Sequence, residues 1–280
     1  MSLDSRKDRV FVSLSTIPSR ANDPLFIRHI RWLTRQTVPP EKIFVILCRA
    51  YKRFPGQAVE ERVASELGTI PRVEVCWADE DLGPATKFVF PLEHRYEEIK
   101  DGLLIVIDDD RFYHPRMIEI YLDALAAHPG AHVLGGNQEF YFQRRLYETL
   151  GGRPSVRASD SRYVAAFMSF LLNPAAADWR PLVAFTRTIL REVPESFFHD
   201  EGILLNYLRF LDLRVLYVNF AFVPWVEEEM ENALCTGSFV DRRACERRIE
   251  EWLNASRYLG VTHHHRPSRL SALLRRRLAL

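Results

Sequence analysis

Leu103-Leu104-Ile105-Val106-Ile107-Asp108-Asp109-Asp110 is the stretch that decides the fold of this chain. Its five apolar residues follow one another without alternation, which is typical of a strand buried on both faces of a parallel sheet. Ligands of open α/β sheets bind at the carboxyl ends of such strands, where the acidic triplet stands. Carboxylates packed this closely favour a hard cation such as Mg2+ or Mn2+. The pattern indicates a site for a metal and a diphosphate, and its plain alternative is a solvated acidic turn that caps the next helix.

Three further apolar runs precede this strand and predict a sheet. Val10–Leu14, Ile43–Cys48 and Val73–Trp77 have the composition of buried strands. Between them, Leu25–Thr34 has helical spacing, and valine or leucine recurs at every fourth position from Val59 to Leu67. Strands that alternate with helices imply right-handed crossovers and a mostly parallel sheet. The fold class predicted from the sequence is therefore α/β.

The second half of the chain has a different pattern. A helix is expected over Pro115–His128, and glycine-rich segments then bracket aromatic pieces, which favours an α+β arrangement. No segment resembles a linker, so residues 1–262 are expected to form one domain. This domain would consist of two halves, residues 1–115 and residues 116–262. A basic C-terminal segment, residues 263–280, would follow it.

Composition excludes several classes of protein. The net charge is +1, so no overall basic field favours nucleic acid as the partner. The charged start, Met1–Arg9, lacks the apolar core of a secretory signal, and no apolar run is long enough to span a bilayer. The four cysteines have no metal-site spacing. We therefore expect a cytoplasmic globular protein.

Four motifs follow or precede the predicted strands in a fixed order. They are Ser13–Arg20 (SLSTIPSR), Gln36–Pro40 (QTVPP), Asp81–Lys87 (DLGPATK) and Asp108–Asp110. As a set they resemble the nucleotide-sugar glycosyltransferases of the GT-A fold, and most closely the small family 2-like enzymes of bacteria and large algal viruses. The likeness covers about the first 115 residues well. It implies a GT-A type, Rossmann-like, mostly parallel central sheet flanked by helices, with an α+β acceptor-side half.

The resemblance also implies a metal site. In such enzymes the last carboxylate of the acidic motif binds Mn2+ or Mg2+, which here is Asp110. The first, Asp108, would contact the ribose or donor sugar and share in the metal site, with Asp109 between them. One of His263, His264 and His265 would complete the metal shell, with His263 favoured as the first of the run. These histidines also have an ordinary interpretation as an incidental surface run.

The residues expected to bind the donor lie in the same motifs and at the acidic end of the third strand. Lys87 is the most informative of them, because a cation at the beginning of a helix opposes the helix dipole. It is expected to reach the diphosphate or a donor hydroxyl. For Arg20 and the acidic loop, plain exposure to solvent stays an alternative. The full set is Thr16, Pro18, Arg20, Asp79, Asp81, Gly83, Pro84, Lys87, Asp108 and Asp109.

Two acidic residues are candidates for the catalytic base. Asp200 and Glu201 open a predicted helix that runs to about Phe210. The resemblance implies an acidic pair near the acceptor, and in an inverting enzyme Asp200 would take the proton from the acceptor hydroxyl. Glu201 is the second candidate. Both residues would also be favoured at a helix start by the dipole alone.

The expected partners follow from the same likeness. The donor would be a UDP-sugar, or else a GDP-sugar, and the acceptor a glycan or lipid-linked glycan of surface polysaccharide synthesis. Arginines interleaved with leucines after Arg266 predict a basic amphipathic helix on the inner face of a membrane, or a packed or disordered end.

Two other functions remain open. A sugar nucleotidyltransferase would have a glycine-rich loop after the first strand, which Ser15-Thr16-Ile17-Pro18 lacks. A non-catalytic carbohydrate-binding protein would not need the acidic triplet.

Overall fold

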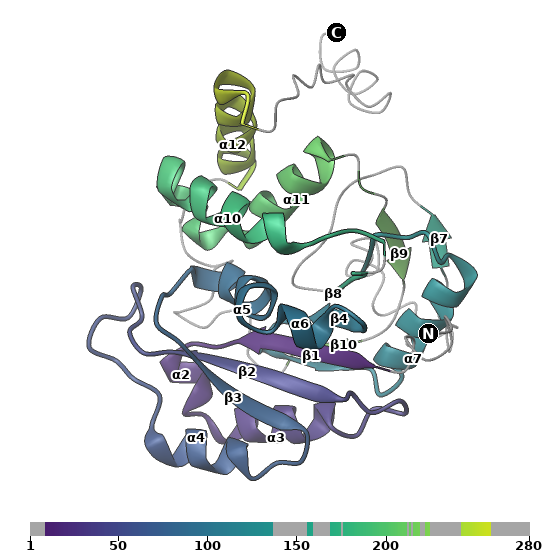
Figure 1. Cartoon of the computed structure of the whole chain (residues 1–280). Helices are drawn as coiled ribbons and strands as arrows, with labels where there is room; N and C mark the ends of the chain where they lie inside the picture. The colour runs from purple at the N-terminus through teal and green to yellow at the C-terminus, as the bar shows by residue number, and fades with distance from the viewer. Residues whose placement is uncertain are drawn as a thin grey trace, which may run out of the picture.

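An eight-stranded sheet with the strand order β3-β2-β1-β4-β8-β6-β9-β7 forms the centre of the molecule (Figure 1). The computed structural model describes residues 9–136, 156–158, 169–174, 176–211, 213, 215–218, 222–224 and 242–258. All strands run parallel except β7 and β8, which pair antiparallel with their neighbours. The strands are β1 (Val10–Ser15), β2 (Lys42–Cys48), β3 (Val73–Ala78), β4 (Leu103–Val106), β6 (Val133–Gly136), β7 (Val156–Ala158), β8 (Phe170–Leu172) and β9 (Val215–Val218).

The first four strands confirm the sequence prediction to within one residue at each end. Strand β4 is buried along its whole length, because its unbroken apolar run faces side chains on both sides of the sheet. It pairs in parallel with β1 from Val10↔Leu103 to Ser13↔Val106. The carboxyl ends of β1 and β4 therefore lie next to each other, and the predicted α/β class with a mostly parallel sheet is confirmed.

Helices cover both faces of the sheet (Figure 1). In the view of Figure 1, α2 (Pro18–Ala21), α3 (Pro24–Leu33) and α4 (Glu61–Gly68) lie below β1, β2 and β3, and α5 (Thr86–His94) lies above them. Further helices and short 3-10 turns pack around α5 and the second half of the sheet. These are η1 (Gly83–Ala85), α6 (Tyr96–Ile99), α7 (Met117–Ala127), α10 (Arg180–Glu192), η3 (Pro194–Phe198), α11 (Asp200–Phe210) and α12 (Arg242–Ser256).

Local sequence explains where α3 begins. Pro24 occupies its first turn, where a missing N–H is harmless, and the Asp23 carboxylate accepts a 2.8 Å hydrogen bond from Leu25 N. The predicted helices over Leu25–Thr34 and Pro115–His128 correspond to α3 and α7. In contrast, Val59 precedes α4, although it shares the spacing of the helix.

A two-stranded antiparallel ribbon follows the acidic triplet. It consists of β5 (Arg111–Tyr113) and β10 (Phe222–Pro224), with Tyr113 opposite Phe222. Strand β8 pairs with β4, so the two halves that the sequence predicts contribute to one sheet. The turn at 108–110 is thus fixed on both sides by strand pairing.

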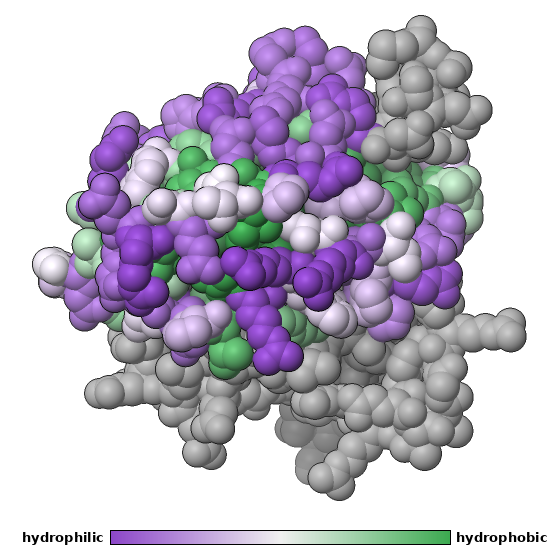
Figure 2. Space-filling model, turned by 90° about the horizontal axis from the view of Figure 1, so that it is seen from below, coloured by the Kyte–Doolittle hydropathy of each residue, from purple (hydrophilic) through white to green (hydrophobic). Residues whose placement is uncertain are grey.

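The surface below the sheet is seen directly in Figure 2. Hydrophilic residues dominate its described part, with smaller hydrophobic areas between them. Among the described residues, no helix combines the length and the apolar composition that crossing a bilayer requires.

Candidate active site

The acidic triplet lies at the carboxyl edge of the sheet, as the sequence predicts. Asp108 stands two residues after the end of β4, and its backbone N–H donates a 3.0 Å hydrogen bond to Tyr113 Oη on the ribbon. The Asp109 side chain is buried, with 6% of it exposed, whereas 20% of the Asp110 side chain is exposed. The three carboxylates therefore differ in their access to a ligand, and Asp110 is more open than Asp109.

Arg20 contacts the triplet from α2, the short helix that follows β1. Its Nη1 lies 2.5 Å from Asp109 Oδ1, and its Nη2 lies 3.4 Å from Asp110 Oδ2. Burial by itself lowers the pKa of Arg20, but Asp109 and Asp110 outweigh it and raise that pKa above its ordinary value. This arginine, expected to bind the donor, thus holds the acidic turn in place.

Lys87 joins two parts of the site that are far apart in the sequence. Its Nζ lies 2.6 Å from Asp108 Oδ1 and 2.8 Å from Asp200 Oδ2, and only 4% of its side chain is exposed. Burial alone lowers the pKa of Lys87, but the two carboxylates outweigh it and raise that pKa. Burial likewise raises the pKa of Asp108, but the Lys87 ammonium outweighs it and lowers that pKa. Lys87 and Asp108 are therefore a charged, mutually neutralising pair.

The backbone of Lys87 is also anchored. The Ser13 hydroxyl, on the buried strand β1, donates a 2.6 Å hydrogen bond to the Lys87 carbonyl oxygen. This contact fixes the first turn of α5 against β1, the strand that precedes the helix of Arg20. The Ser13–Arg20 and Asp81–Lys87 motifs are thus connected by this hydrogen bond, and each forms an ion pair with the acidic triplet.

Asp110 is the residue of the triplet that best fits a metal ligand. Burial raises its pKa to about 6, and its nearest cations, Arg20 and Arg111, stand 3.4 Å from its oxygens. Within the described ranges, no group of three or more histidine, cysteine, aspartate or glutamate side chains is arranged to hold a metal. Mg2+ and Mn2+ commonly use one or two carboxylates and complete their shells with water and substrate phosphates, so Asp110 suits this type of site. His263, His264 and His265 lie outside the described residues.

The two candidate bases diverge at the start of α11. Asp200 points to Lys87, whereas Glu201 Oε2 lies 3.5 Å from Arg242 Nη1 at the start of α12. Burial and the neighbouring Asp200 charge raise the pKa of Glu201 to about 7, and Arg242 only partly opposes them. Glu201 is therefore partly protonated at neutral pH.

Asp81 holds the turn that leads into Lys87. Its Oδ1 accepts a 2.8 Å hydrogen bond from Gly83 N, and its Oδ2 accepts one of the same length from Lys52 N. Gly83 has a φ of +63°, and a Cβ there would overlap the carbonyl oxygen of Phe197 in η3. Asp81 and Gly83 thus shape a tight turn against the segment that precedes Asp200.

The remaining predicted donor residues lie at different depths. Thr16 is buried beyond β1, Pro18 begins α2, and Pro84 lies inside η1. Asp79 is 90% exposed and pairs with Arg49 at 2.9 Å. The structure brings Arg20, Lys87, the triplet and Asp200 into one network, and that network does not include Asp79.

The prediction from sequence missed three residues that shape this network. Arg111 and Tyr113 contact Asp110 and Asp108, respectively, from the ribbon. His29 is buried beside Phe112, and burial lowers its pKa to about 3 in spite of a backbone hydrogen bond at Asp109, so it stays neutral. The position of Arg111, directly after three acidic residues, could have identified it as their partner. Nothing in the sequence distinguishes His29 from the other buried residues of α3.

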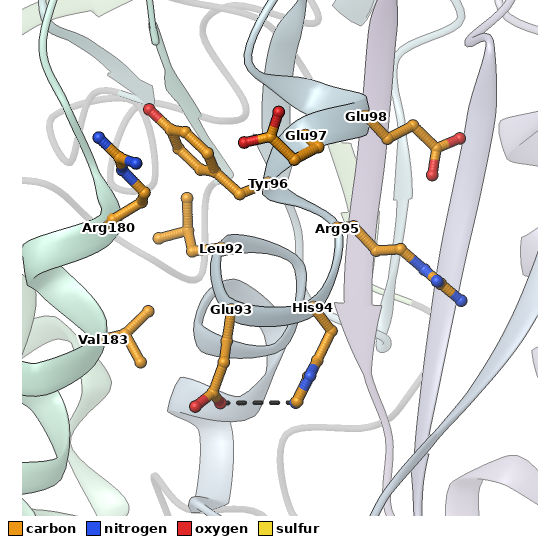
Figure 3. Close-up of a pocket in the computed structure, with 9 residues that line it drawn as sticks. All are labelled: Leu92, Glu93, His94, Arg95, Tyr96, Glu97, Glu98, Arg180 and Val183. Atoms are coloured by element: carbon orange, nitrogen blue, oxygen red, sulfur yellow. Dashed lines mark ion pairs between the residues drawn. The ribbon is translucent and has the colours of Figure 1, made fainter.

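A groove of about 550 Å3 lies between α5, α6 and α10, away from these residues (Figure 3). The Arg180 guanidinium stacks over the Tyr96 ring at 4.9 Å, and His94 pairs with Glu93 at 3.5 Å. The groove is at the last turn of α5, whereas Lys87 is in the first turn. Its lining consists of Leu92, Glu93, His94, Arg95, Tyr96, Glu97, Glu98, Arg180 and Val183, none of them a predicted site residue.

Comparison with known proteins gives distant structural neighbours. No family model matches the chain, and no curated protein matches it in sequence. The crystal structure of HddC from Yersinia pseudotuberculosis aligns with a TM-score of 0.43 at 12% identity, over 81% of this chain and 97% of that chain. The crystal structure of a mycobacterial protein aligns with a TM-score of 0.48 at 12% identity, over 90% of this chain and 76% of that one. Similarity of this degree says nothing about activity.

Proposed function

We propose that this protein is a metal-dependent glycosyltransferase of the GT-A type. It would move a sugar from a nucleoside diphosphate sugar to a hydroxyl of a glycan or lipid-linked acceptor. The observation that supports the proposal best is the network at the carboxyl edge of the sheet. There Lys87 pairs with Asp108 of the acidic triplet and with Asp200 at the start of α11. The proposed reaction needs carboxylates that hold the metal on the donor side and a carboxylate that accepts the proton of the acceptor hydroxyl, all within one site.

Asp110 is the proposed metal ligand, with Asp108 beside it. A bound Mn2+ or Mg2+ would offset the charge that develops on the departing nucleoside diphosphate. Arg20 keeps the acidic turn in position through Asp109, and the η1 turn keeps Lys87 beside Asp108. His263 is the residue we propose to complete the metal shell.

Asp200 is the proposed general base. One of its oxygens is held by Lys87, and the carboxylate can accept the acceptor proton as the acceptor oxygen attacks the anomeric carbon. Glu201 is the second candidate, since a base with a pKa of about 7 suits proton transfer at neutral pH. This assignment implies inversion at the anomeric carbon.

The proposal extends to the partners and to the place of reaction. A UDP-sugar is the favoured donor and a GDP-sugar the second candidate. The acceptor would belong to surface polysaccharide synthesis on the cytoplasmic side. The basic segment 263–280, outside the described residues, would contact the inner face of the membrane.

Ligand-dependent thermal stability tests the donor site. The melting temperature of the protein is measured with UDP, GDP, CDP and dTDP, each with and without Mn2+. Binding to the native state at a hundredfold excess over Kd stabilises by about 2.7 kcal/mol. We expect a metal-dependent rise with one nucleotide that is lost in Asp110→Ala and kept in Glu97→Ala, because Glu97 is an exposed carboxylate that pairs with Lys100 outside the network. The absence of any rise would contradict the donor-site assignment.

The released product separates the competing functions. A glycosyltransferase releases a nucleoside diphosphate from the sugar nucleotide when acceptor is added. A sugar nucleotidyltransferase releases pyrophosphate from a nucleoside triphosphate and a sugar phosphate, and a carbohydrate-binding protein releases neither.

A further inference from the structure

Lys87 has an environment that is unusual for a substrate-binding lysine. Its side chain is 4% exposed, and its ammonium group lies within 2.8 Å of carboxylates from two remote segments, Asp108 and Asp200. A buried ammonium needs a neutralising partner, and a single carboxylate supplies enough charge. The second carboxylate adds a geometric restraint, because it fixes the distance between the end of β4 and the start of α11.

The rest of the segment keeps the ammonium from moving away. Ser13 binds the Lys87 carbonyl oxygen from β1, and Gly83 packs directly against the Phe197 carbonyl oxygen in η3. Lys87 and the turn before it thus contact β1, which pairs with β4, and η3, which precedes α11. Two of the three N–H donors of the ammonium can thus be directed at carboxylates, which leaves at most one for a diphosphate.

We infer that Lys87 is a positioning residue that sets the place of Asp200 relative to Asp108. This inference rests on the proposed function, because it assigns Asp200 as the base of that reaction. Lys87 acts through Asp200: it orients the carboxylate toward the acceptor, and it connects the donor edge of the sheet to the acceptor helix. This role differs from the one that the resemblance implies, in which Lys87 reaches the diphosphate or a donor hydroxyl.

Steady-state kinetics distinguish positioning from donor binding. Misplacing a catalytic group by about 1 Å costs on the order of a hundredfold in rate, so Lys87→Met should lower kcat by about that factor. The Kd for the nucleotide with Mn2+ should stay unchanged. Lys87→Arg should recover part of kcat, since a guanidinium can still pair with both carboxylates. Lys100→Met, which removes an exposed lysine paired with Glu97, should keep the wild-type kcat. A weakened nucleotide Kd with kcat intact would overturn the inference.

A double-mutant cycle tests the restraint without using activity. Asp108→Asn and Asp200→Asn are compared singly and together by urea unfolding. Each single variant leaves Lys87 one carboxylate, whereas the double variant leaves it none. The double variant should therefore unfold more readily than the sum of the singles predicts, by at least about fivefold in the unfolding constant. Additive effects would overturn the inference.

The two experiments also separate this inference from the proposed function. If the wild-type protein binds no nucleotide and transfers no sugar, the proposed function fails, and with it the role of Asp200 as base. The unfolding cycle would still report whether Lys87 couples the two carboxylates. If Lys87→Met does not fold, Lys87→Arg and the two asparagine variants keep both measurements decisive.

Discussion

The carbonyl oxygen of Phe197 occupies the space that a side chain at Gly83 would need. Gly83 also has a φ of +63°, a conformation that other residues rarely adopt. Because Phe197 belongs to the turn before Asp200, the close approach connects the Gly-Pro-Ala-Thr-Lys motif to the candidate base.

Gly83→Ala should therefore damage both stability and activity. We expect a loss of about 2 kcal/mol or more in the free energy of unfolding, because strain and overlap add. Turnover should fall as well, since η3 must shift and Asp200 follows it. Urea unfolding and product release would measure the two effects.

Gly56→Ala provides a matched control. Gly56 has a φ of +78°, but no atom lies within 4 Å of an added Cβ. Its replacement should cost about 1 kcal/mol from backbone strain and leave turnover unchanged. Equal effects of the two alanines on turnover would contradict the role of the Phe197 contact.

Arg20→Met should destabilise the folded protein by about 3 kcal/mol, because it leaves the buried Asp109 carboxylate without its closest cation. Arg9→Met, at an exposed pair with Glu41, should cost less than about 1 kcal/mol. Differential scanning calorimetry or urea unfolding of the two variants would measure this difference. Similar losses in both would show that Arg20 does not hold the triplet.

Replacement by asparagine should have different effects at Asp109 and at Asp110. Asp109→Asn should lower the melting temperature but keep the Mn2+-dependent rise with nucleotide, because Asp109 faces Arg20 and is nearly buried. Asp110→Asn should keep most of the stability and lose that rise. Thermal scans of both variants with and without Mn2+ and nucleotide check the assignment. If only Asp109→Asn lost the Mn2+-dependent rise in melting temperature, Asp109 and not Asp110 would be the metal ligand.

Glu201 should make stability depend on pH. Its pKa is about 7 in the folded protein, against an ordinary value of 4.5, so the folded state binds more protons than the unfolded state between these values. Stability from this group is therefore present below about pH 4.5 and is lost as the pH rises to about 7, by at most about 3 kcal/mol. The groups that act on it are Asp200, Arg242, Lys87 and Asp108.

Glu201→Gln should remove that part of the pH dependence. Unfolding free energies of the variant and the wild type, measured from pH 5 to pH 8, should show a smaller decline in the variant. Glu97→Gln replaces an exposed carboxylate and should keep the wild-type decline. An unchanged slope in Glu201→Gln would contradict the raised pKa.

The sequence predicts the first half of the fold well because its signals are local. Four apolar runs and their helical spacers define β1 to β4, and the acidic triplet marks the edge of the sheet. The insertion of β8 beside β4 could not be predicted, since pairing between Leu104 and Leu172 depends on contacts that no local pattern encodes.

The candidate site shows the same limit. Sequence patterns predict that Arg20, Lys87 and Asp200 belong to one site, but which cation pairs with which carboxylate depends on the packing of α5 and α11. Asp79 and Asp81 stand close together in sequence, yet one is exposed and the other supports a turn.

Strand β8 covers the side of β4 that faces away from β1. A fragment ending at residue 115 would retain the first four strands and lose this cover, so β4 would present unpaired N–H and C=O groups along an apolar, buried-type strand. Such an open edge pairs readily with other chains. The half of the chain with the strongest motifs would therefore self-associate when expressed alone, and its solubility depends on residues encoded more than fifty positions downstream of its last motif.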